Sequence, residues 1–218
     1  MEPMLGLMTA AGGLNGAGGS GGWLLALVVG ICLSATCGFR IFVPFLGMSI
    51  AAHTGDIQLA SGFEWIGSWT ATTVFTVATV VEVVAYYVPW LDNLLDTVAT
   101  PAAVVAGTIV TAAMVGDISP WLRWSLAAIA GGGAAAIVQT GTVSLRGAST
   151  VSTAGTGNFV VSTLELGAAT LLTILAIVAK IVCLVAVIAI GVAVIGRCRP
   201  RSRSASTPVD GQSKLAFG

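Results

Sequence analysis

The sequence predicts an all-α transmembrane protein, a polytopic bundle of five or six helical spans. Hydrophobic residues make up 56% of its 218 residues, charged residues only 8%, and the mean hydropathy is +0.98. Soluble domains carry about 25% charged residues, so this chain has too few charges to coat a soluble surface. The composition excludes a water-soluble globular enzyme, a disordered chain and a nucleic-acid binder that works through a basic face.

The domain organisation follows from where the apolar residues begin and end. A span needs about 20 apolar residues, so residues 23–196 hold the transmembrane domain. Residues 1–22 are rich in glycine and have no Lys or Arg, so we expect a flexible segment rather than a cleaved signal peptide. Residues 197–218 form a basic, then polar tail, which we expect to be disordered. The positive-inside rule places this basic end in the cytoplasm of a multi-pass protein of the inner membrane.

The first apolar run, Trp23–Ala52, is too long for one straight span. Thirty helical residues extend about 45 Å, whereas the hydrocarbon core is about 30 Å thick. Arg40 and Pro44 interrupt the run. Two structures fit this pattern. One is a single tilted, kinked helix, and the other is a half-helix that breaks near Arg40, with a second segment after Pro44. Small residues spaced by four line one face and favour close helix contact: Gly30, Ser34 and Gly38.

Residues 90–100 predict a short amphipathic helix at the membrane interface. Asp92, Asn93 and Asp96 share its polar face, and apolar residues line the other. Thr100 and Pro101 then restart a helix for the next span. Asp92 and Asp96 lie one turn apart and could hold a divalent cation, although such a pair is more often only the wet side of a helix. An aromatic belt at the interface is expected from three residues: Tyr86, Tyr87 and Trp90.

The remaining apolar runs predict the other spans. They cover residues 70–88, 101–115, 124–139 and 159–196. The last run is long enough for two consecutive helical segments or for one long helix. Between the last two runs, residues 140–158 are rich in Ser, Thr and Gly, with Arg146 as the only charge. This stretch is either a flexible loop or an irregular segment shielded from lipid by neighbouring helices.

The charged residues inside the apolar runs carry the functional hypothesis. Each costs about 2.5–3.5 kcal/mol at the centre of a bilayer, so such residues usually face the interior and pair. We expect Arg40 to pair with Glu82 or Glu165, and Arg146 with the other carboxylate. Together with Asn158 these residues would form a polar path at mid-membrane. This predicts a small transporter or channel for an ion or small solute.

Two other functions remain open. In a non-transporting scaffold or assembly partner the charges would be structural, and small-residue faces, including Gly131–Gly133, would bind a second copy or another membrane protein. The other open function is a lipid-processing enzyme. The chain lacks the HExxH, GxSxG and P-loop motifs, however, so we expect no catalytic residue. His53 is the only histidine and no CxxC occurs, so neither a metal nor another cofactor is expected. We expect the lipid bilayer as a partner, and we expect no binding to nucleic acid.

Several polar motifs inside the apolar sequence are distinctive. They are Cys-Gly-Phe-Arg at 37–40 followed by Pro44, the segment 89–96, the glycines 131–133, Arg-Gly-Ala-Ser-Thr at 146–150, and Gly-Asn at 157–158. With these motifs the chain resembles an uncharacterised bacterial membrane family, the domain of unknown function 4126, from Leu24 to Val194. The resemblance implies an integral membrane protein and no established activity.

Overall fold

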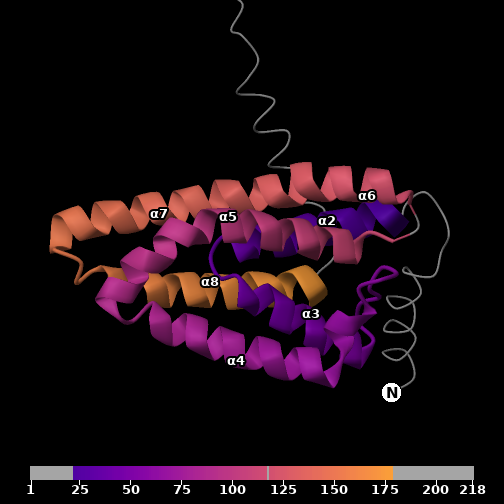
Figure 1. Cartoon of the computed structure of the whole chain (residues 1–218), viewed down its shortest axis with the longest axis horizontal. Coiled ribbons are helices and arrows are strands. Elements are labelled where there is room, and N and C mark those ends of the chain that lie inside the picture. The colour runs from indigo at the N-terminus through magenta and orange to yellow at the C-terminus, as the bar shows by residue number, and fades with distance from the viewer. Residues whose placement is uncertain (1–21, 117, 179–218) are drawn as a thin grey trace, which may run out of the picture.

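The computed structural model describes residues 22–116 and 118–178; for residues 89–94 and 96 it describes the backbone only. Within this part of the chain every regular element is a helix, which confirms the all-α prediction (Figure 1). The elements, in chain order, are α2 (Gly22–Cys37), α3 (Phe42–Thr54), the 3-10 turn η2 (Glu64–Gly67), α4 (Trp69–Ala85), α5 (Pro89–Met114), α6 (Pro120–Leu126), the π-helical segment η3 (Ala127–Gly132), α7 (Gly133–Thr153) and α8 (Asn158–Val178).

The first apolar run folds as two short helices, α2 and α3, that break at residues 38–41. α2 runs antiparallel to α5, because Gly30 lies against Thr111 while Ser34, further along α2, reaches back to Gly107. Its 16 described residues extend about 24 Å, and the 13 residues of α3 about 20 Å, compared with a hydrocarbon core of about 30 Å.

The direction of α3 shows that the break is a reversal. Arg40 bonds to Ser162 and Gly47 lies against Thr173, so α3 runs parallel to α8. Because α5 and α8 are both antiparallel neighbours of α7, α2 and α3 point in opposite directions. They form a helical hairpin that begins and ends at one end of the bundle (Figure 1). The prediction of a single kinked helix is therefore wrong. The break lies near Arg40 as the alternative predicts, but Pro44 falls inside the first turn of α3.

Three helices are long and apolar enough to cross a membrane: Thr97–Met114 within α5, the continuous stretch Pro120–Thr153, and Asn158–Val178. α2, α3 and α4 are apolar but shorter. The described part of the chain thus has the character of a membrane protein with three candidate spans, whereas the sequence predicts five or six. The rest of the last apolar run, from residue 179, lies outside the described residues, as do segments 1–21 and 197–218.

The interface helix expected at 90–100 is not a separate element. α5 continues unbroken from Pro89 to Met114, with Pro101 in its interior. Proline removes one helical hydrogen bond and crowds the preceding turn, which can bend a helix without ending it. Figure 1 shows this bend in α5. The break expected at Thr100–Pro101 is therefore wrong.

The polar stretch 140–158 is also different from both expectations, because most of it is helix α7. Its hydroxyl groups donate to backbone carbonyls four residues earlier, as Thr140 does to Ala136 and Ser144 to Thr140. This bonding satisfies serine and threonine inside a helix, so an apolar environment no longer excludes them. Only a short turn remains, with Ala154 in the left-handed region before α8 begins at Asn158.

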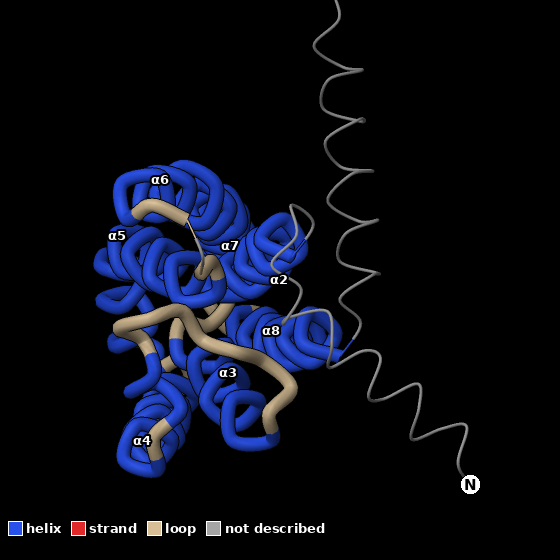
Figure 2. Tube along the Cα trace, turned by 90° about the vertical axis from the view of Figure 1, so that its right-hand side faces the viewer, coloured by secondary structure: helices blue, strands red, loops and turns tan. Residues whose placement is uncertain are grey.

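The small-residue face on α2 packs as predicted. Gly30 and Ser34 contact α5, and Gly38 lies against the backbone of α7 at Ala135 and Gln139. The Ser34 hydroxyl donates to the Gly107 carbonyl at 2.6 Å. Figure 2 shows the result: α2, α5 and α7 lie together, α3 and α8 form the middle of the bundle, and α4 lies at its edge beside α3.

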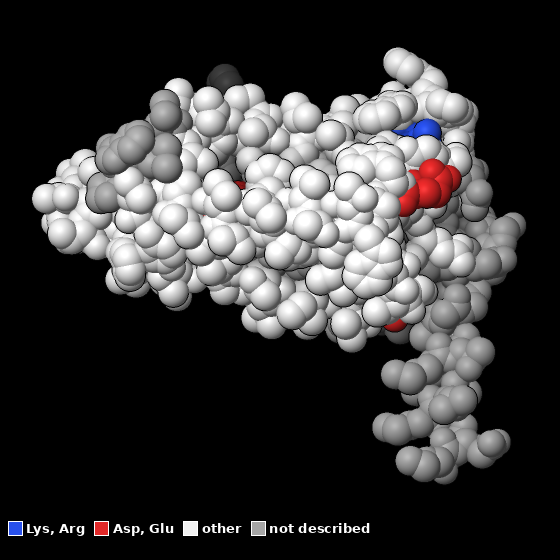
Figure 3. All heavy atoms as spheres, turned by 60° about the horizontal axis from the view of Figure 1, so that its bottom comes forward, with Lys and Arg blue, Asp and Glu red and all other residues white. Residues whose placement is uncertain are grey.

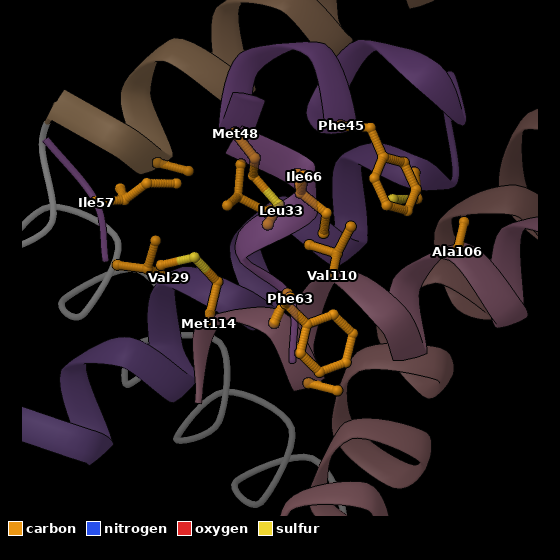
Figure 4. Packing of buried hydrophobic residues seen from close by; sticks show 14 of the residues in the cluster. Val29, Leu33, Phe45, Met48, Ile57, Phe63, Ile66, Ala106, Val110 and Met114 are labelled. Carbon is orange, nitrogen blue, oxygen red and sulfur yellow. The ribbon is translucent and has the colours of Figure 1, made fainter. Parts of the chain in front are cut away.

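Apolar side chains from the α2–α3 hairpin, the loop after it and α5 form most of the core (Figure 4). Leu33, Met48, Ile66 and Val110 are all fully buried there. The outer surface is apolar too, with exposed valines along α4. Figure 3 shows an almost uncharged face with charged atoms gathered mainly at one end. This pattern suits a protein surrounded by lipid.

Candidate functional site

The four predicted charged side chains converge where the hairpin reverses. Arg40 lies in the turn between α2 and α3, Glu82 in the last turn of α4, Arg146 in α7 and Glu165 in the second turn of α8. Each is 5% exposed or less, so the protein buries two cations and two anions in one region.

Tyr86 joins the two arginines. The Cζ atoms of Arg40 and Arg146 lie 4.0 and 4.1 Å from the centroid of the same Tyr86 ring, within cation–π distance. Because the Tyr86 side chain is only 6% exposed, its expected place in an aromatic belt is wrong. A clue was present in the sequence, because Tyr86 lies one helical turn after Glu82 and so shares its side of the chain.

Arg146 and Glu165 form a closed ion pair between α7 and α8. The Nε atom of Arg146 donates to Oε1 of Glu165 at 3.1 Å, and Nη2 donates to Oε2. This two-point contact is the strongest arrangement available to an arginine and a carboxylate. It confirms the prediction that Arg146 pairs with one of the two buried carboxylates.

Glu82 instead holds the start of α3. Its Oε1 accepts the Ile41 N–H at 2.8 Å, and its Oε2 accepts the Phe42 N–H at 3.1 Å. These are backbone groups of the first helical turn, which has no side-chain cap of its own at Ile41. The carboxylate also lies at the positive end of the helix dipole, so α4 supplies the cap that α3 lacks.

Arg40 points the other way, toward α8. Its Nη2 donates to the Ser162 carbonyl at 2.9 Å. Within the described residues, its Nε and Nη1 atoms and the Ser162 hydroxyl are buried without a hydrogen-bond partner, and no ion pair joins Arg40 to Glu82 or Glu165. The predicted pairing of Arg40 with a carboxylate is therefore wrong. The physical reason is that backbone N–H groups bind one carboxylate and Arg146 binds the other.

The other predicted residues lie elsewhere. Asn158 donates to the Thr150 hydroxyl at 2.9 Å and closes the α7–α8 turn, about 10 Å along α8 from Glu165. The side chains of Asp92 and Asp96 lie outside the described residues, so the interfacial cation site stays a prediction. Among the described residues no cluster of three or more metal-ligating side chains occurs.

A groove of about 530 Å³ between α4 and α5 leads to this region. Its walls are almost entirely apolar, and Glu82 and Tyr86 are among its lining residues. The others are Ile41, Phe42, Thr73, Val74, Val77, Ala78, Val81 and Ala85 on the α3–α4 side and Leu95, Val98, Ala99 and Ala102 on α5. Figure 3 shows a small patch of acidic atoms inside a hollow, away from the charged atoms at the right-hand end of the face.

The fold and the site define an all-helical protein with apolar candidate spans around a buried group of charges. The chain belongs to the family described as Domain of unknown function (DUF4126), whose model matches residues 27–198. No curated protein and no solved structure matches the chain. Because the family description names no activity, the function has to be argued from the site itself.

Proposed function

We propose that this protein is a small membrane transporter or channel for an ion or small solute, and that the tip of the α2–α3 hairpin forms its site. The observation that carries the proposal is the reversal of the chain beside four buried charges. Non-helical backbone inside a membrane protein is tolerated where it is shielded by protein or lines a polar cavity. In transporters the ends of such broken helices bind substrates and coupling ions.

The contacts of Glu82 suggest how a passing ion would act on the hairpin. The carboxylate accepts from the N–H groups of Ile41 and Phe42, and its negative charge strengthens both hydrogen bonds. A proton or cation that reached this carboxylate would weaken its hold on the start of α3. Ion arrival at Glu82 would thereby be coupled to movement of the hairpin tip next to Arg40.

A non-transporting scaffold is the second candidate, and one observation favours it. The buried small residues are used for contacts inside the bundle, but among the described residues Gly141 and Gly147 on α7 have no neighbouring atom where a side chain would lie. Small residues on an outward helix face permit close contact with a second membrane helix. In either function we propose an inner-membrane protein without enzymatic activity, its C-terminal end in the cytoplasm as the basic tail predicts.

Ion flux into liposomes that contain the purified full chain tests the first proposal. We would impose proton and potential gradients and follow them with a pH dye and a potential dye. Wild-type protein should dissipate at least one gradient, whereas a folded Glu82→Gln variant should lose this flux.

The matched control is Glu64→Gln, since Glu64 is an exposed residue at the start of η2 whose carboxylate accepts the nearby Gly62 N–H. This variant should retain wild-type flux. An absence of flux under every gradient in the wild type would contradict the ion-conducting form of the proposal. Equal loss in both variants would contradict a site at Glu82.

A further inference from the structure

The groove between α4 and α5 exists because these two helices pack on different partners. α4 packs on α3 and η2, whereas α5 packs on α2, η3 and α7. The space between them, about 530 Å³, lies within the usual range for small-molecule sites. Its walls carry Val77 and Val81 of α4 and Val98 of α5, which are all more than half exposed. In a membrane the mouth of this groove would face lipid.

Glu82 is the only charged residue among the described residues that line the groove. An ionised carboxylate can accept about four hydrogen bonds, and the N–H groups of Ile41 and Phe42 use two of these positions. Neither nearby arginine forms an ion pair with Glu82, because Arg146 binds Glu165, while Arg40 donates to the Ser162 carbonyl and lies over the Tyr86 ring. The groove therefore combines apolar walls with one anion that has acceptor capacity left and no ion-pair partner within the described residues.

From this combination we infer that the groove binds a lipophilic cation, meaning an apolar body with one positive charge such as a protonated amine, a quaternary ammonium or a phosphonium. The inference names the substrate class of the proposed transport site and rests on that proposal. The apolar body would fill the space between α4 and α5. The positive charge would approach the open acceptor positions of Glu82, where an anionic head would be repelled and a neutral one would gain no ion pair.

Exchange with a proton keeps the charge of the buried region constant. If Glu82 is protonated before the cation arrives, its O–H bond breaks on cation binding. The electron pair of that bond stays on the carboxylate, and the proton passes to water. One positive charge enters and one departs, so the net charge of the buried region is the same before and after the exchange. Cation binding to protein in which Glu82 is protonated should therefore release a proton from Glu82.

Two probes of the same shape and opposite charge test the inference. Purified full-length protein in an uncharged detergent would be titrated with tetraphenylphosphonium and with tetraphenylborate, with heat and proton release recorded. We expect saturable binding of the cation, accompanied by proton release, and no comparable binding of the anion. Since a charge-assisted contact is lost, Glu82→Gln should weaken cation binding by at least about tenfold.

A steric pair of variants keeps the test valid if Glu82→Gln does not fold. Ala78→Phe would fill the groove, whereas Val80→Phe adds the same side chain at an exposed α4 position outside the lining. Cation binding should fall in Ala78→Phe and stay at the wild-type value in Val80→Phe. Equal affinity for both probes, no cation binding, or binding that survives Ala78→Phe would overturn the inference. Glu82-dependent ion flux without cation binding would overturn the inference but leave the proposed function standing.

Discussion

The two helical hairpins α2–α3 and α7–α8 each place one arginine against the ring of Tyr86, but the two arginines bind different kinds of partner. α7 and α8 are continuous helices of 21 residues, and their Arg146 and Glu165 bind one another. α2 and α3 are short and broken. There Arg40 bonds to a backbone carbonyl, and the nearby carboxylate of Glu82 bonds to backbone N–H groups.

The backbone explains this difference. In an unbroken helix the N–H groups are engaged within the helix, so the Glu165 carboxylate takes its donors from the Arg146 side chain. A helix start leaves its first N–H groups free, and the break at residues 38–41 presents two of them to Glu82. Similar residue types thus form a closed ion pair in the α7–α8 hairpin. At the tip of the α2–α3 hairpin, Arg40 and the neighbouring Glu82 of α4 have no ion pair within the described residues.

Breaking the closed pair should have the largest effect on stability. Arg146→Met leaves the Glu165 carboxylate buried without its cation, which costs about 3–5 kcal/mol in comparable buried pairs. We expect a large fall in the thermal unfolding midpoint of the purified protein, followed by circular dichroism.

The double variant Arg146→Met/Glu165→Met separates this cost from lost packing. It removes both charges and should recover much of the stability, because apolar replacements of whole ion pairs are often nearly neutral. A double variant as unstable as Arg146→Met would contradict the assignment of the pair as the cause.

Patterns of spacing and charge predict much of this architecture. The helical class, the contacts of Gly30, Ser34 and Gly38, and the pairing of Arg146 follow from rules on composition and helix periodicity. Part of the site can also be predicted from the sequence, because a charged residue inside an apolar run is costly wherever it lies in the membrane. Its four charged residues are thus visible in the sequence, and the structure brings them together.

Choices between competing backbone states are harder to predict. Pro101 bends α5 without ending it, and the hydroxyls of 140–153 support a helix where their polarity suggests a loop. The partner of Glu82 could not be foreseen either, because the N–H groups of Ile41 and Phe42 become available only once the chain breaks there. The fold, rather than the residue types, decides these contacts.

A smaller effect is expected at the tip of the broken hairpin, where close backbone packing fixes its position. A Cβ atom at Gly38 would lie 2.7 Å from the Ala135 carbonyl oxygen and 2.8 Å from the Gln139 nitrogen. Gly38→Ala must push the tip away from α7 and should cost about 1–3 kcal/mol, as overpacking does. The same unfolding measurement would show it.

Gly141→Ala in α7 is the control for that substitution. In the part of the chain that the structure describes, no atom lies within 4 Å of its Cβ position, so the change should leave stability the same or raise it by about 0.5–1 kcal/mol through helix propensity. Equal losses at both positions would show that the hairpin tip is no more tightly packed than the outer face of α7.

The smallest effect on stability is expected for Arg40→Met, the counterpart of Arg146→Met. The change removes one hydrogen bond to Ser162 and the cation–π contact with Tyr86, along with two buried nitrogen atoms that lack partners in the described residues. Since the gain and the loss oppose one another, the net change should stay below about 1 kcal/mol. If the hairpin tip is the transport site, liposome flux should nevertheless be lost. A fall in stability as large as that of Arg146→Met, or unchanged flux in a folded protein, would mean that both arginines serve the fold alone.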